Sequence, residues 1–106
     1  MSYRFMRMIL FFDLPSVSKK EKREYQKFVK SLKNKGFIMM QESVYTKLAL
    51  NPSVANSTLL DLKKKLPPNG QVSMLTITEK QFSSIEHLLG GFETDVIDND
   101  KQVIKL

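Results

Sequence analysis

The chain has 106 residues, of which 42% are hydrophobic and 26% are charged, and this composition is typical of a single globular domain. It contains no cysteine, which excludes a disulfide framework and a thiolate metal site. The formal net charge is +6, and residues 18–35, with eight bases and two acids, account for all of it. A positive charge concentrated in one segment favours a polyanionic partner.

Residues 3–12 form an apolar run that predicts a central strand. Only Arg4 and Arg7 interrupt the run, so apolar side chains occupy odd and even positions, and we expect both faces of the strand to be covered. Asp13 follows where the strand ends, two residues before Pro15. The run is too short and too charged for a membrane span or a signal peptide, so we expect a cytoplasmic protein without membrane contact.

The basic segment predicts a helix. Ser18 and Glu21 have the spacing of a capping box, and Gly36 is placed to end the helix in the left-handed conformation. An apolar stripe at helical spacing consists of Tyr25, Phe28, Val29 and Leu32. On the opposite side, a cationic ridge with the same spacing consists of Lys20, Arg23, Lys27 and Lys30, and Lys19 adjoins it at the helix start.

The remaining elements complete an α+β pattern. Residues 37–50 predict one bent strand or a pair joined at residues 42–43, and Asn51 with Pro52 begins a second helix. A proline-rich turn at residues 67–70 precedes a strand over residues 72–78, and a short helix over 78–89 and a strand over 102–106 follow.

This order predicts a ferredoxin-like βαββαβ sandwich with an extra C-terminal helix and strand. We expect residues 1–90 to form the ferredoxin-like domain. Residues 91–106 form an acidic segment and strand that we expect to contact a dimer partner or another protein. Because the predicted strands are apolar on both faces, a second copy is the simplest cover for the second face, and the sequence predicts a homodimer.

The cationic ridge is the main candidate for a binding site. Four cations in line along a helix match the regular charge of a phosphate backbone, which dominates the affinity of nucleic-acid binding. The alternative interpretation is an ordinary solvated helix face.

Asp13 is the candidate metal ligand. Magnesium takes oxygen ligands, and a two-fold axis near the strand ends would bring two copies of this carboxylate together. In the alternative interpretation, Asp13 orients the turn at Leu14 and Pro15. His87 is more simply structural, and Ser43 and Tyr45 lack an adjacent base that would make either a nucleophile.

Three motifs together resemble the CRISPR-associated protein 2 family, the small adaptation protein of prokaryotic immunity. They are the strand ending in Phe12-Asp13-Leu14-Pro15, the basic helix, and Gln41-Glu42-Ser43-Val44-Tyr45 after Gly36-Phe37. The opening Met-Ser-Tyr-Arg and the segment over residues 78–82 are most similar to members that accompany Cas9-type effectors.

The resemblance implies a homodimer that binds double-stranded DNA and bridges dimers of the CRISPR integrase, CRISPR-associated protein 1, during spacer acquisition. It implies as an alternative a magnesium-dependent endonuclease acting on RNA or DNA, with Asp13 as catalytic residue and metal ligand and one Mg²⁺ shared by the dimer. The segment after Asp13 carries lysines where many relatives carry arginines, and lysine binds phosphate as a point charge.

Overall fold

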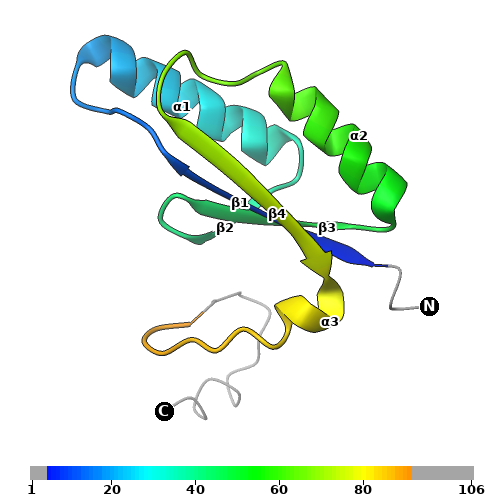
Figure 1. Ribbon diagram of the computed structural model, residues 1–106. Coiled ribbons are helices and arrows are strands. Elements are labelled where there is room, and N and C mark those ends of the chain that lie inside the picture. The colour runs from blue at the N-terminus through cyan, green and yellow to red at the C-terminus, as the bar shows by residue number, and fades with distance from the viewer. Residues whose placement is uncertain (1–4, 92–106) are drawn as a thin grey trace.

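The computed structural model describes residues 5–91 of the chain. The elements follow in the order β1 (Met6–Asp13), α1 (Lys19–Asn34), β2 (Ile38–Gln41), β3 (Val44–Ala49), α2 (Pro52–Lys63), β4 (Gln71–Thr78) and α3 (Glu79–Phe82). The strands form an antiparallel sheet of order β2-β3-β1-β4, and α1 and α2 both lie on one face of it (Figure 1). The ferredoxin-like α+β fold is therefore confirmed. The predicted strand over 102–106 and the acidic segment over 91–106 lie outside the part of the chain described here, apart from residue 91.

The central strand β1 has one buried row and one open row of side chains. Met8, Leu10 and Phe12 face the helices and are buried, whereas Phe11 in the alternate row is 44% exposed. The register places Ile9 opposite Thr46 on β3 and opposite Leu75 on β4, so these residues share the second face. We call this surface the open face; its apolar residues are Ile9, Phe11, Leu48, Leu75 and Ile77, and it also contains Arg7 and the buried Thr46. The helices α1 and α2 cover only the other face of β1, so cover of the open face by a second copy stays a prediction.

The helix α1 begins and ends as its sequence predicts. The Ser18 hydroxyl accepts a hydrogen bond from the Glu21 N–H at 3.1 Å, and the Glu21 carboxylate accepts one from the Ser18 N–H at 3.0 Å. Gly36 has a φ of +94°, and the Phe37 N–H donates to the Leu32 carbonyl at 3.0 Å to close the last turn. These caps fix the length of the helix, and burial of Phe28 and Leu32 fixes its orientation.

A two-residue turn at Glu42 and Ser43 joins β2 to β3, so the pair of strands is correct and the single bent strand is not. Ser43 adopts a φ of +65°, which is a left-handed conformation. We did not expect this conformation, because the turn contains no glycine. The register also shifts between Met39 and Gln41, which bends this edge of the sheet.

The helix α3 is shorter than the predicted helix over residues 78–89. The hydroxyls of Ser83 and Ser84 donate to the carbonyls of Lys80 and Gln81 at 2.8 and 2.6 Å, and such local bonds compete with further helix. The Arg7 side chain holds α3 against β1 by donating to both carboxylate oxygens of Glu79, at 2.9 and 2.7 Å. Its guanidinium also lies 4.4 Å from the centre of the Phe82 ring.

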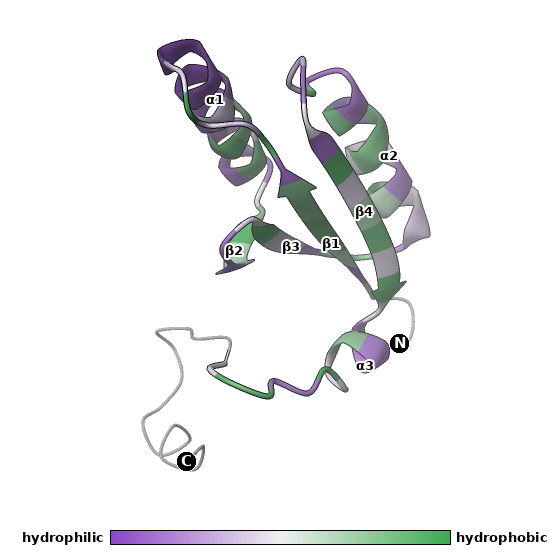
Figure 2. Cartoon of the chain, turned by 60° about the vertical axis from the view of Figure 1, so that its left-hand side comes forward, coloured by the Kyte–Doolittle hydropathy of each residue, from purple (hydrophilic) through white to green (hydrophobic). Residues whose placement is uncertain are grey.

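Hydrophilic and hydrophobic residues separate clearly along the chain (Figure 2). The strongest hydrophilic colouring lies on α1, whereas β1 is predominantly hydrophobic. The second helix, α2, begins with Asn51 as its cap and with Pro52 in its first turn, as predicted. Across residues 5–91, no helix has the length and apolar character needed to cross a membrane.

Candidate nucleic-acid interface and acidic site

The predicted nucleic-acid-binding residues all belong to α1 and are all exposed; they are Lys19, Lys20, Arg23, Lys27 and Lys30. The apolar stripe explains this placement, since Phe28 and Leu32 are buried against the sheet and turn the basic side outward. Charged ends of these long side chains can therefore reach a large ligand without loss of core packing.

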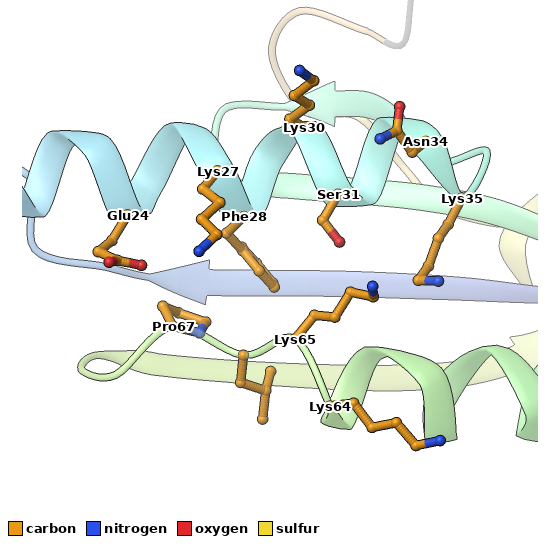
Figure 3. Close-up of a pocket in the computed structure, with 11 residues that line it drawn as sticks. Glu24, Lys27, Phe28, Lys30, Ser31, Asn34, Lys35, Lys64, Lys65 and Pro67 are labelled. Carbon is orange, nitrogen blue, oxygen red and sulfur yellow. The ribbon is translucent and has the colours of Figure 1, made fainter.

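The cationic ridge borders two separate hollows. Lys20 lines a small one of about 200 Å³ together with Leu14, Pro15 and Asn69. Lys27 and Lys30 line a larger groove of about 580 Å³ between α1 and the end of α2. Figure 3 shows Lys27 pointing into this groove, whereas Lys30 points away from it. The ridge is thus less uniform than its helical spacing predicts.

Three further lysines line the same groove: Lys35, Lys64 and Lys65. Lys64 and Lys65 follow the end of α2, whereas the neighbouring Lys63 does not line the groove. Lys35 was not among the predicted binding residues, and its Nζ lies 3.6 Å from Oδ2 of Asp61 on α2. Helical spacing within one element could not reveal a groove formed by two elements.

Asp13 is the last residue of β1 and is exposed, opposite Gln71 in the register with β4. It belongs to the same alternate row as Phe11, at the edge of the open face. Within residues 5–91 no three His, Cys, Asp or Glu side chains gather closely enough to hold a metal ion. The described part of one chain therefore offers magnesium fewer than three such ligands at Asp13, which fits a site only if further ligands come from elsewhere, as from a second chain.

The residue before Asp13 joins the acidic site to the basic helix. Phe12 makes edge-on contacts with Tyr25 and Phe28 of α1, with ring centres 5.8 and 5.5 Å apart. It also stacks on Tyr45 of β3 at 5.9 Å. This aromatic cluster fixes α1 relative to the strand that ends in Asp13.

The other candidates do not form a reactive site. Burial raises the pKa of the Tyr45 phenol, with a smaller contribution from Tyr25, so this hydroxyl keeps its proton at neutral pH. Ser43 lies in the β2–β3 turn, and His87 is exposed beyond α3. Within the part of the chain that the structure covers, neither residue lies in a cluster of three or more His, Cys, Asp or Glu side chains.

Comparison with known proteins finds related sequences that match most of the chain. The sequence model of the family described as "CRISPR associated protein Cas2" matches residues 6–85. A protein of Treponema denticola named "CRISPR-associated endoribonuclease Cas2" is 41% identical over 101 residues, covering 95% of this chain and 100% of its own length. A protein of the same name from Streptococcus mutans serotype c is 43% identical over 101 residues, covering 95% of this chain and 93% of its own length.

A solved structure titled "Crystal structure of cas2" has the same fold. Its TM-score is 0.61 at 18% sequence identity, and the match covers 90% of this chain and 98% of that one. This chain belongs to the CRISPR-associated protein Cas2 family.

Proposed function

We propose that this protein is a DNA-binding scaffold in CRISPR adaptation, in which a homodimer bridges dimers of the CRISPR integrase during spacer acquisition. The observation that carries the proposal is the exposed cationic ridge on α1, a helix anchored to the core and capped at both ends. Family membership supports a role in a CRISPR system, which acts on nucleic acid in the cytoplasm.

The ridge suits a duplex because it offers charge without base-reading chemistry. Lysine contacts phosphate as a point charge, so the contacts depend little on the sequence of the DNA. Phe12 and Phe28, which lie behind the ridge, are buried and cannot stack on bases, and Tyr25 is half-buried.

The open face supports the dimer in this proposal. Phe11, Leu48 and Leu75 are 44%, 39% and 51% exposed on a surface that also contains Ile9 and Ile77. Contiguous apolar surface of this kind marks an interaction site, and a second copy related by a two-fold axis covers it with matching chemistry. The ridges then remain free on the helix side of each chain.

Reversal of the ridge charges tests DNA binding directly. Changing Lys20, Arg23, Lys27 and Lys30 to glutamate should weaken binding to unrelated duplexes equally and lower the slope of log K against log salt by about 0.9 for each lost phosphate contact. The matched control changes four exposed lysines outside the ridge to glutamate: Lys22, Lys33, Lys63 and Lys80. Equal affinities of the two variants would remove the ridge from the binding surface.

A second candidate function is a magnesium-dependent endonuclease, because relatives of this chain are named endoribonucleases and because Asp13 is exposed at the end of β1. In this proposal Asp13 and its copy in the second chain hold Mg²⁺, and the bound ion supplies water activation and charge stabilisation at the phosphate. The role of the chain itself is to position the two carboxylates.

Asp13→Asn should abolish magnesium-dependent cleavage of single-stranded RNA and leave DNA binding and dimer formation intact. Glu42→Gln, which removes an exposed acid from the β2–β3 turn, is the control and should cleave as the unaltered protein does. Cleavage that persists in Asp13→Asn would exclude this residue as the metal ligand.

A further inference from the structure

The groove between α1 and the end of α2 has the features of a second phosphate-binding site. Its volume is about 580 Å³, and of the residues between 5 and 91 that line it, five are lysines and one, Glu24, is an acid. We propose that one strand of a nucleic-acid backbone lies in this groove, so that the bound duplex crosses from α1 to α2 instead of following α1 alone. This inference rests on the proposed DNA-binding function and adds the path of the DNA.

The lysines of the groove come from both of its walls. Figure 3 shows Lys27 from α1 and Lys65 from the end of α2 pointing into the space between the two helices. Like charges directed into one space repel each other, and a ligand with several negative charges removes this repulsion. A chain of phosphates supplies such charges at regular intervals.

The Ser31 hydroxyl provides an independent indication of a ligand. Ser31 lines the groove from α1, and its Oγ is buried without a hydrogen-bond partner among residues 5–91. Buried hydroxyls are almost always paired, so a bound water or a ligand oxygen would be its natural partner. In Figure 3 the hydroxyl points toward the same space as Lys27 and Lys65, where a phosphate oxygen would accept its hydrogen bond.

The lining favours the backbone of the nucleic acid over its bases. Among residues 5–91, Phe28 is the only aromatic residue that lines the groove, and it is 2% exposed. Binding of bases by stacking requires an accessible aromatic face, which this groove does not offer. The uncharged hydroxyl of Ser31 lies beside the lysines and suits a phosphate oxygen as well.

The experiment compares charge reversals inside and outside the groove in the complete protein. Lys65→Glu should weaken binding to a mixed-sequence duplex several-fold and lower the salt slope by about 0.9, because one phosphate contact is lost. The matched control, Lys63→Glu, makes the same charge change at an exposed residue that does not line the groove. Ser31→Ala should weaken binding several-fold without lowering the thermal midpoint, because its hydroxyl has no partner to lose.

The outcomes separate this inference from the proposed function. If Lys20→Glu with Arg23→Glu weakens binding but Lys65→Glu matches its control, the groove is excluded and the DNA-binding function stands. If the unaltered protein does not bind duplex, both fail. If sodium tripolyphosphate binds in a Lys65-dependent manner while duplex binding is insensitive to Lys65, the groove takes free polyphosphate and the assigned backbone path is wrong.

Discussion

Gly70 lies directly against the backbone of Asp13. A Cβ atom at Gly70 would be 2.7 Å from the Asp13 carbonyl oxygen and 2.7 Å from Cδ2 of Leu14. Gly70 also has a φ of +103°, a conformation that side chains strongly disfavour. The turn between α2 and β4 therefore determines where the strand that carries the candidate acid ends.

Gly70→Ala should destabilise the protein by at least about 2 kcal/mol, since it adds a backbone clash to an unfavourable φ. Urea unfolding measures this free energy. Gly90→Ala is the matched control, because Gly90 has a φ of +75° but no atom within 4 Å of the added Cβ. If the two variants lose the same free energy, the contact with Asp13 contributes nothing. Under the nuclease hypothesis, only Gly70→Ala should also lower magnesium-dependent cleavage.

Leu75→Lys should convert the proposed dimer into a monomer, because it places a charge on the open face opposite Ile9. Light scattering after size-exclusion chromatography measures the mass of the particle. Leu60→Lys is the control: both leucines are 51% exposed, but Leu60 belongs to α2, away from the open face. A monomeric unaltered protein, or equal loss of dimer in both variants, would contradict the assignment of the open face as the interface.

Glu21→Gln should change how stability depends on acid. The pKa of Glu21 lies below its ordinary value of 4.5 because its carboxylate accepts hydrogen bonds from the N–H groups of Ser18 and Val17. A carboxylate whose pKa is lowered by folding stabilises the protein above its unfolded pKa, and this stabilisation disappears as pH falls through the folded value. Glutamine keeps an accepting oxygen but does not titrate.

The free energy of unfolding, measured in urea from about pH 7 to about pH 3, should therefore fall more steeply for the unaltered protein than for Glu21→Gln below about pH 4.5. The charge-matched comparison is Glu86→Gln, at an exposed residue outside the helices. Parallel curves for Glu21→Gln and the unaltered protein would show that the negative charge of Glu21 does not stabilise the helix cap.

Arg7→Lys should loosen α3. Lysine cannot make the two parallel bonds to Glu79 that arginine makes, and it stacks less well on Phe82. The Glu79 N–H donates to the Phe5 carbonyl at 3.1 Å, so faster hydrogen exchange at this amide would report the change. Lys80→Arg, at a neighbouring exposed residue, should leave the exchange rate unaltered. Equal exchange in all three proteins would mean that the Glu79 pair does not hold α3.

The elements with local signals were predictable from the sequence. The Ser18 capping box, the Asn51–Pro52 helix start and Gly36 each satisfy specific backbone groups, and each appears in the structure as expected. The left-handed conformation of Ser43 and the early end of α3 were not predicted, because serine conformations depend on tertiary neighbours and on competing hydrogen bonds.

The candidate site was only partly predictable, for a related reason. The ridge on α1 and the position of Asp13 follow from spacing within one element. The groove lies between α1 and residues Lys64 and Lys65, which follow the end of α1 by about 30 residues. Gly70, in the turn between α2 and β4, lies against Asp13 at the end of β1. Proximity of this kind arises from packing, which periodicity does not encode.

The packing of Phe12 connects any ligand that binds α1 to the end of β1. Its ring is wedged among Tyr25, Phe28 and Tyr45, and the next residue along the chain is Asp13. A tightly packed interior transmits displacement and does not absorb it. A displacement of α1 by a bound, stiff polymer should therefore also displace the end of β1, where the Asp13 carboxylate lies, through the packing of the Phe12 ring.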